Sequence, residues 1–268
     1  MPEGHVIHRL ANELESTFGG APVTVTSPQG RFAAASTLNG SRLTSAEAWG
    51  KHLFLLFDAA KPAHIVHIHL GLIGTLRLSP LAPPVGQVRL RLANSTTAAD
   101  LRGPQWCTLL TEAEMQQKVA KLGADPLRID ADPTSIRTKV QRSSRSIASL
   151  LMDQKLFAGV GNIYRAETLF RLGIDPTTPG TAIDTETFQD IWSDLVLLMR
   201  DGVSSGRIDT VRPEHTPEAM NRPARKDDHG GEVYVYRRDG NPCHICGTPI
   251  SHSVLEGRNL FWCPGCQQ

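Results

Sequence analysis

The feature that most limits how this chain can fold is a pair of Cys-x-x-Cys motifs near its C-terminus. Cys243 and Cys246 form the first pair and Cys263 and Cys266 the second, with 16 residues between the pairs. Each pair can close a tight turn with two thiolates facing one point, and together they offer the four sulfur ligands that zinc prefers in a tetrahedral site. Two disulfides, or four unrelated cysteines, are the alternatives. Because four cysteines leave no open position for water, the pattern predicts one structural Zn²⁺.

The remaining composition is that of an ordinary globular protein. A length of 268 residues corresponds to roughly two domains. The 28 Lys and Arg and the 27 Asp and Glu give a formal net charge of +1, which excludes anion binding through bulk charge alone but not a local basic surface. No apolar run approaches about 18 residues, and the N-terminus lacks the core of a signal peptide. We therefore expect no membrane segment and a reducing, cytoplasmic location.

The first hundred or so residues show a helical pattern followed by strand patterns. Apolar side chains recur at helical spacing over residues 4–18, up to a Gly-Gly pair. Short apolar runs between Gly, Pro, Asn and Asp then indicate an antiparallel sandwich or barrel, with strands at 52–57, 64–70, 74–78, 88–92 and 105–110. Cys107 is expected to be a buried strand residue rather than a nucleophile. His64, His67 and His69 alternate at strand spacing and are expected to pack and hydrogen-bond rather than to bind a metal.

From residue 112 onward the pattern is mainly helical. Residues 159–162 leave room only for a tight turn between two of the predicted helices, and residues 203–232 are polar and rich in Pro, which predicts a long, mobile loop. The predicted helices cover residues 111–123, 145–158, 163–172 and 185–200.

Two residues at the start of the chain are candidates for chemistry. Removal of the initiator methionine would expose Pro2, whose nitrogen would be a secondary amine able to attack an electrophilic sugar carbon and give an iminium cation. Glu3 is placed to move protons beside it. Lys51, just before a strand, has a charge that would disfavour protonation of a nearby amine and would hold a phosphate. The alternative is that Pro2 and Glu3 merely begin the chain and that Lys51 is a solvated lysine.

The order of these motifs resembles that of the formamidopyrimidine-DNA glycosylase and endonuclease VIII family of base-excision repair enzymes. The resemblance extends over nearly the whole chain, and the ending FWCPGCQ at 261–267 is closer to endonuclease VIII. It rests on MPEG at the start, Gly50-Lys51, HLGLIG at 69–74, MDQKLFAGVGNIYRAETLFRLGIDP at 152–176 and the C-terminal CxxC…CPGC pattern.

The resemblance implies an α+β, multidomain fold. An N-terminal antiparallel β-sandwich flanked by helices would form the catalytic domain at residues 1–121. A linker and a helix–two-turn–helix domain would follow at 122–232, and a β-hairpin zinc finger would occupy 233–268.

The resemblance also implies roles for individual residues. Pro2 matches the nucleophile that forms a Schiff base at C1′ of the damaged nucleotide, and Glu3 the proton donor. Lys51 matches the lysine assigned to β-elimination, and Arg258 the zinc-finger arginine that grips phosphate and is assigned to δ-elimination. Leu72 matches the side chain that fills the gap left by a flipped nucleotide. The remaining expected DNA contacts are Lys121, Lys155 and Asn162.

The expected function is removal of oxidised bases, preferably pyrimidines, from DNA, followed by strand cleavage through β,δ-elimination. Damaged or abasic DNA is the expected partner of a monomer in the bacterial cytoplasm, associated with the nucleoid. His5 and Val6 depart from the Pro and Glu common in the family at these places, which leaves open a weakened, damage-binding paralogue. The loop at 205–232 does not resemble the lesion-capping loop of 8-oxoguanine enzymes, although a purine-lesion glycosylase of the same fold is a further alternative.

Overall fold

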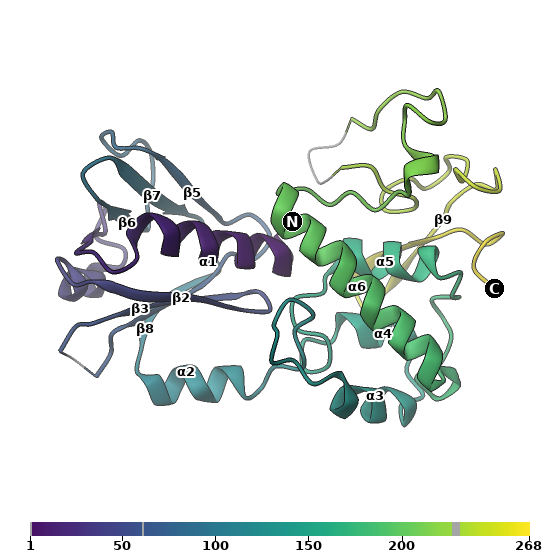
Figure 1. Cartoon of the computed structure of the whole chain (residues 1–268), viewed down its shortest axis with the longest axis horizontal. Coiled ribbons are helices and arrows are strands. Elements are labelled where there is room, and N and C mark those ends of the chain that lie inside the picture. The colour runs from purple at the N-terminus through teal and green to yellow at the C-terminus, as the bar shows by residue number, and fades with distance from the viewer. Residues whose placement is uncertain (1, 61, 227–230) are drawn as a thin grey trace. The chain divides into compact units, whose positions relative to one another are not determined.

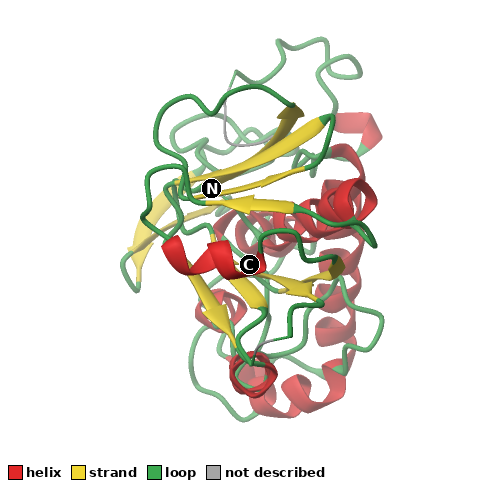
Figure 2. Ribbon diagram, turned by 90° about the vertical axis from the view of Figure 1, so that its left-hand side faces the viewer, coloured by secondary structure: helices red, strands yellow, loops and turns green. Residues whose placement is uncertain are grey.

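The computed structural model describes residues 2–60, 62–226 and 231–268, which form two compact units, Met1–Lys121 and Leu122–Gln268 (Figure 1). The first unit contains two antiparallel four-stranded sheets, and Figure 2 shows its strands in two layers. This confirms the predicted β-sandwich. One sheet has the order β1-β6-β7-β5 and the other β2-β3-β4-β8. The strands are β1 (Thr24–Thr26), β2 (Leu43–Trp49), β3 (His52–Phe57), β4 (Ile65–His69), β5 (Thr75–Pro80), β6 (Leu90–Ala93), β7 (Thr97–Arg102) and β8 (Trp106–Leu110).

Helix α1 (Gly4–Phe18) packs against the second sheet through the apolar face that its sequence predicts. Ile7, Leu10, Leu14 and Phe18 are all buried. The short helix α2 (Glu112–Val119) follows the last strand and begins with a capping box between Thr111 and Glu114. A 3₁₀ helix, η1 (Ala33–Leu38), covers part of the first sheet next to β1.

Two strands of the sandwich have sequences that do not indicate a strand. β2 reads LTSAEAW and β7 reads TAADLR, and both are poor in the branched and aromatic residues that favour strands. β7 is nevertheless paired on both sides, with β5 and β6, and its small residues Ala98 and Ala99 are almost completely buried. Its Asp100 lies 3.5 Å from the Arg91 guanidinium on β6.

The second unit contains four α-helices among its described residues. They are α3 (Pro133–Gln141), α4 (Ile147–Met152), α5 (Asn162–Arg171) and α6 (Thr185–Ser205). A hairpin of β9 (Ser251–Leu255) and β10 (Arg258–Trp262) follows, and two short 3₁₀ helices, η2 (Gly180–Ala182) and η3 (Pro213–His215), interrupt the connections. Tyr234, Tyr236, Leu260 and Phe261 belong to the same buried core as the helices. The segment expected to form the helical domain, up to residue 232, and the segment expected to form the zinc finger, from residue 233, therefore share one hydrophobic core.

The helix predicted over residues 145–158 is shorter in the structure, where α4 ends at Met152. The side chains of the next two residues bind the backbone in place of helical hydrogen bonds. Asp153 accepts from the Lys155 N–H at 3.0 Å. The Gln154 amide donates to the Val160 carbonyl at 2.9 Å and accepts from the Gly159 N–H at 3.1 Å. These contacts form the tight turn that leads into α5.

No helix among the described residues is long and apolar enough to cross a membrane.

A buried carboxylate on α5 holds the segment that leads to the hairpin. Glu167 is fully buried and accepts hydrogen bonds from the backbone N–H groups of Tyr234, Val235 and Tyr236 at 2.7, 2.9 and 2.8 Å. The Thr210 hydroxyl donates to the same carboxylate at 2.6 Å. A buried charge is tolerated only when its hydrogen bonds are complete, and here four donors surround it.

Three histidines in the first unit are neutral: His5 and His67 are buried, and His52 is half-buried. The rings of His52 and His67 stack, and His52 Nδ1 lies 2.8 Å from His67 Nε2, a contact that two neutral rings can make as donor and acceptor. Burial, followed by neighbouring positive charges, lowers the pKa of His52 to about 4 and that of His67 to about 3. Burial also lowers the pKa of His5 on α1 to about 4. The expectation that His67 packs and hydrogen-bonds thus agrees with its surroundings.

The Glu167 contacts predict a large cost for a conservative change. In Glu167→Gln an amide would turn two donor hydrogens toward backbone N–H groups, leaving donors unpaired in the core. We expect a loss of about 2–4 kcal/mol in the free energy of unfolding, measured by urea titration. Glu186→Gln is the matched control, because Glu186 is exposed on α6. Equal stability of the two variants would contradict this role of Glu167.

The neutral histidines predict that the first unit loses stability in mild acid. Below pH 6.5 the unfolded chain binds protons that the folded chain excludes until about pH 4, so stability falls as the pH drops through this window. We expect the free energy of unfolding to fall on the order of 3 kcal/mol. Thermal melting at a series of pH values measures this loss. His52→Asn/His67→Asn should flatten the pH dependence, whereas His252→Asn, an exposed residue, should not. An unchanged slope in the double variant would contradict the assignment.

Candidate functional site

The N-terminal candidates lie at the first turn of α1. Pro2 is half-buried, and Glu3, the residue that precedes the helix, is fully buried. The buried apolar face of α1 fixes this end of the helix against β2. Glu3 thus occupies the N-cap position of α1.

Lys51 belongs to the two-residue turn between β2 and β3. Trp49 pairs with His52, so Gly50 and Lys51 are the turn residues, and Gly50 adopts a left-handed φ of 59° that favours glycine. At the other end of β2, Gly19 pairs with Leu43, and the Ala46 N–H donates to the Glu15 carboxylate at 3.3 Å. α1 therefore runs opposite to β2.

This antiparallel arrangement brings the start of α1 and the β2–β3 turn to the same end of the unit (Figure 1). Pro2, Glu3 and Lys51 thus lie at one end of the sandwich although nearly 50 residues separate them.

His69 is a residue near this end whose position the sequence pattern did not reveal. It ends β4, accepts from the Gly71 N–H at 3.1 Å and packs against the Trp106 ring. Leu53 pairs with Ile68, so the end of β4 lies beside the β2–β3 turn that contains Lys51. Burial lowers the pKa of His69, and the charge of Lys51 lowers it further. The site end of the sandwich therefore contains a neutral imidazole beside a lysine.

Leu72 and Ile73 lie on the exposed turn between β4 and β5. Their side chains are 63% and 84% exposed, which is unusual for large apolar residues. Gly71 has a φ of 69°, and a Cβ there would lie 2.9 Å from Gln105 Cβ, so glycine is required where the turn passes the residue before β8. The structure thus places Leu72 outside the core, where it is available for contact with another molecule.

In the second unit, Asn162 and Arg165 connect α5 to the hairpin. Asn162 is buried, and its amide donates to the Asn259 carbonyl at 2.9 Å. Arg165 donates to the Asn162 side chain and, at 2.8 Å, to the same Asn259 carbonyl. The side chain expected to contact phosphate is therefore also a structural link to β10.

Arg258 opens β10 and is exposed. The turn before it consists of Glu256 and Gly257, both with left-handed φ angles of 48° and 73°. Arg145 lies 3.4 Å from the Glu256 carboxylate and 3.0 Å from that of Asp153, so it connects the hairpin turn to both ends of α4. These residues border a cavity of about 180 Å³ that Arg258 and Arg165 also line.

The two remaining predicted contacts are exposed lysines. Lys155 lies in the turn after α4, and Lys121 follows α2 at the last position of the first unit.

The four C-terminal cysteines come together as a potential metal site. Their sulfur atoms all lie within 4.8 Å of one another, with 3.4 Å between Cys246 and Cys263 and 3.8 Å between Cys243 and Cys266. A tetrahedral site with Zn–S bonds of about 2.3 Å requires sulfur atoms about 3.8 Å apart. Gly265 has no room for a side chain, since a Cβ would lie 3.0 Å from Cys246 Sγ. The residues therefore fit a tetrahedral metal ion.

The surroundings of these thiols differ. Hydrogen bonds from Thr248 lower the pKa of Cys246 to about 6, whereas burial raises the pKa of Cys263. A bound cation is what would keep all four as thiolates at neutral pH. Cys107, by contrast, lies half-buried in β8, where burial raises its pKa to about 12 and keeps it a neutral thiol.

Comparison with known proteins agrees with these features. Residues 1–105 match the formamidopyrimidine-DNA glycosylase N-terminal domain, and residues 122–212 match the formamidopyrimidine-DNA glycosylase H2TH domain. Endonuclease 8 1 of Mycobacterium tuberculosis is 49% identical, with all of both chains covered. The formamidopyrimidine-DNA glycosylase of Geobacillus kaustophilus is 31% identical over 92% of this chain and 89% of its own.

Solved structures show the same fold. Lactococcus lactis formamidopyrimidine-DNA glycosylase, non-covalently bound to DNA containing an abasic site, superposes with a TM-score of 0.78 at 21% identity, covering 99% of each chain. MutM in complex with DNA containing carbocyclic 8-oxo-G gives a TM-score of 0.76 at 22% identity over the full length of both chains. The chain therefore belongs to the formamidopyrimidine-DNA glycosylase and endonuclease VIII family of DNA-repair glycosylases.

Proposed function

We propose that this protein is a bifunctional DNA glycosylase and abasic-site lyase that removes oxidised bases, preferably pyrimidines. One observation carries the proposal: the fully buried Glu3 lies next to Pro2 at the start of α1, at the end of the sandwich where Lys51 forms the β2–β3 turn. A buried carboxylate and a lysine near an N-terminal proline supply a nucleophile, a proton carrier and a fixed positive charge.

In the proposed reaction the Pro2 amine attacks C1′ of a flipped nucleotide, and the bond from C1′ to the base breaks. Glu3 supplies a proton as the base leaves and the sugar ring opens, which gives an iminium cation on the Pro2 nitrogen. The iminium withdraws electrons, so a proton is lost from C2′ and the 3′ phosphate leaves in β-elimination. Loss of the 5′ phosphate in δ-elimination follows, and water releases the sugar from the enzyme.

Four exposed side chains and the buried Asn162 are the proposed contacts with damaged or abasic DNA. Leu72 would fill the gap left by the flipped nucleotide, at a cost of a few kcal/mol in unstacking. Arg258, Asn162, Lys155 and Lys121 would contact phosphates, and Arg258 would assist δ-elimination. We further propose that the enzyme acts as a monomer in the bacterial cytoplasm, associated with the nucleoid.

The preference for pyrimidines is supported by the relatives named endonuclease 8, which share 49% of their residues with this chain. The relatives named formamidopyrimidine-DNA glycosylase share about 31%. A purine-lesion glycosylase is the second candidate. Duplexes with thymine glycol, dihydrouracil, 5-hydroxycytosine or 8-oxoguanine, compared by single-turnover excision, separate the two.

Zinc is the proposed occupant of the four-cysteine site. Cys243 and Cys263 are part of the second unit's core, so the ion would fix the hairpin that carries Arg258 to the helices. Its role would be structural.

A covalent intermediate tests the assignment of Pro2. Sodium borohydride should trap an adduct between the enzyme and abasic-site DNA, after intact mass has shown that Met1 is removed. One additional residue before Pro2 turns its nitrogen into an amide and should abolish the adduct. Glu3→Gln should still be trapped on abasic DNA but should lose base excision by about 10²-fold or more. An adduct of equal yield with the blocked N-terminus would contradict the assignment of Pro2.

The metal content tests the four-cysteine site. Elemental analysis should find one zinc per chain, and removal with a chelator should lower the melting temperature of the second unit. Cys246→Ser should lower zinc content and abasic-DNA affinity together. Cys107→Ser is the control and should keep its zinc, because Cys107 lies in the other unit. Full zinc content in a variant lacking two of the four cysteines would contradict the site.

A further inference from the structure

Arg145 has no role in the proposed reaction, yet both its backbone and its side chain are bound. Its N–H donates to Ser143 Oγ at 3.2 Å, and its carbonyl accepts from the Gly180 N–H at 2.9 Å. Its guanidinium lies 3.0 Å from the Asp153 carboxylate, just after α4, and 3.4 Å from the Glu256 carboxylate in the β9–β10 turn. One side chain thus connects the start of a helix to a hairpin turn 111 residues further along the chain.

The turn that receives this contact contains a residue that such turns rarely use. Leu255 pairs with Arg258, which leaves a turn of two residues. Both turn residues, Glu256 and Gly257, have left-handed φ angles. Hairpin turns of this kind favour Asn, Asp or Gly, and a glutamate at a left-handed φ is uncommon. The glutamate side chain, however, forms an ion pair with Arg145 that neither asparagine nor glycine could form.

Arg258 is the first residue after this turn, and its backbone is held on the other side as well. The carbonyl of the next residue, Asn259, accepts hydrogen bonds from two side chains of α5. Arg145, Glu256 and Arg258 all line the cavity of about 180 Å³ described above. The ion pair therefore lies close to the Arg258 side chain, and breaking it would release the turn on one side only.

The ion pair is too exposed to contribute much to folding. The side chains of Arg145 and Glu256 are 43% and 57% exposed, and water and salt screen such pairs. A substitution in the pair should leave the hairpin folded, because Leu260 and Phe261 anchor it in the core of the unit. Its effect should be a wider range of turn positions. In an enzyme a displacement of about 1 Å can lower a rate about 10²-fold.

We propose that Arg145 is a positioning residue for Arg258. By binding Glu256 it fixes the turn from which β10 begins, and it thereby sets how often strand cleavage continues from β- to δ-elimination. The inference rests on the proposed function, in which Arg258 assists δ-elimination. In that step C4′ loses a proton, a C4′–C5′ double bond forms, and the C5′–O bond breaks with its electron pair on the phosphate. A correctly placed guanidinium stabilises the negative charge that develops there.

The experiment uses duplex DNA with a preformed abasic site and an excess of the full-length, zinc-loaded protein. Under these single-turnover conditions neither base excision nor a modest loss of affinity changes the ratio of δ- to β-product, which is read from a gel. Arg145→Gln and Glu256→Gln should each lower this ratio about tenfold, while loss of the intact strand changes by less than about twofold. The double variant should be no worse than either single variant, because all three lack the same ion pair. Arg145→Lys, which keeps the charge, should give an intermediate ratio.

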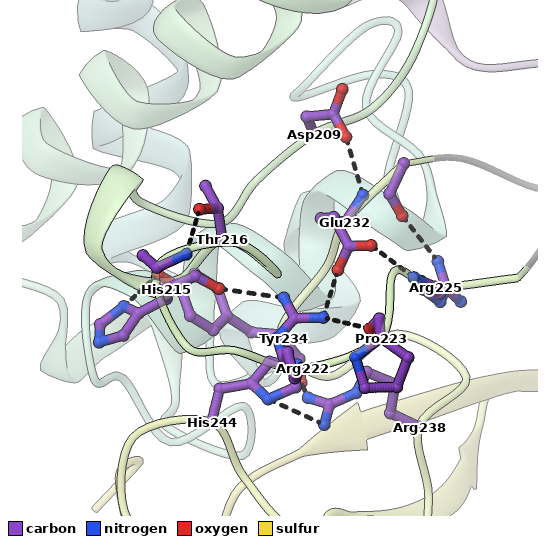
Figure 3. Close-up of polar contacts among 12 residues, drawn as sticks. Asp209, His215, Thr216, Arg222, Pro223, Arg225, Glu232, Tyr234, Arg238 and His244 are labelled. Atoms are coloured by element: carbon purple, nitrogen blue, oxygen red, sulfur yellow. Dashed lines mark hydrogen bonds and ion pairs between the residues drawn. The ribbon is translucent and has the colours of Figure 1, made fainter.

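Arg207→Gln is the matched control. Arg207 lies 3.3 Å from the Asp209 carboxylate, in an exposed ion pair of the same unit. Asp209 also accepts from the Glu232 N–H at 2.8 Å, so this pair belongs to the segment after α6 and not to the hairpin turn (Figure 3). The control variant should keep the product ratio of the wild type.

The two halves of the pair separate positioning from direct contact with DNA. If Arg145 itself held a phosphate, Arg145→Gln would lower the ratio and Glu256→Gln would not, and that result would overturn the inference. An unchanged ratio in Arg145→Gln would overturn it as well.

Failure of this inference is distinguishable from failure of the proposed function. A wild type that breaks no strand would contradict the proposed lyase activity, and one that stops after β-elimination would contradict the roles of both Arg145 and Arg258. Amide hydrogen exchange over residues 255–258 needs no DNA. It should be faster in Arg145→Gln and Glu256→Gln than in the wild type and unchanged in Arg207→Gln, and equal exchange in all four proteins would overturn the positioning role whatever the activity.

Discussion

The second unit depends on one helix, α5. Its side chains make hydrogen bonds to backbone N–H and C=O groups that have no partner in a β-sheet. Its Glu167 carboxylate receives three consecutive N–H groups from residues 234–236, and its Arg165 and Asn162 side chains bind the Asn259 carbonyl of β10. Buried backbone polar groups without partners would cost several kcal/mol each. The polar side chains of this mostly buried helix make the hydrogen bonds that a neighbouring β-strand would otherwise make. Through them the cysteine hairpin is attached to the helical core.

This arrangement determines how the hairpin presents Arg258. The link at Asn259 is one residue from Arg258, and the ion pair between Arg145 and Glu256 lies on the other side of the turn. An exposed ion pair contributes little to stability, about 0–1 kcal/mol, so its effect is on geometry rather than on folding. The backbone of Arg258 is thus held from both sides of the turn, while its side chain is exposed.

Much of the fold was predictable because its strongest signals are local. The apolar face of α1, the β3 run HLFLLF and the capping of α2 are all properties of neighbouring residues, and each predicted element is found. β2 and β7 were missed because tertiary contacts, rather than their own composition, make them strands: β7 is paired on both sides, and β2 pairs with β3 and is covered by α1. The helix predicted through residue 158 was wrong beyond Met152, since Asp153 and Gln154 bind the turn backbone with their side chains.

The site shows the same division between local and distant information. The cysteines, Pro2, Glu3 and Lys51 belong to short motifs, and those motifs predicted them as candidates. Arg145 was not, because its partner Glu256 lies 111 residues away, and neither was the position of His69 beside Lys51. Nothing in a single sequence indicates which of 21 arginines will meet which carboxylate.

The net charge of +1 is therefore a poor guide to the phosphate contacts of this protein. Several arginines are committed to the fold: Arg165 binds the hairpin, Arg171 lies 2.9 Å from Asp194, and Arg91 is buried beside Asp100. A side chain already neutralised in this way releases no further counterions when DNA binds, whereas an exposed lysine does. Affinity for DNA would then depend on a few uncompensated cations, and its salt dependence would be shallow relative to the 28 basic residues in the chain.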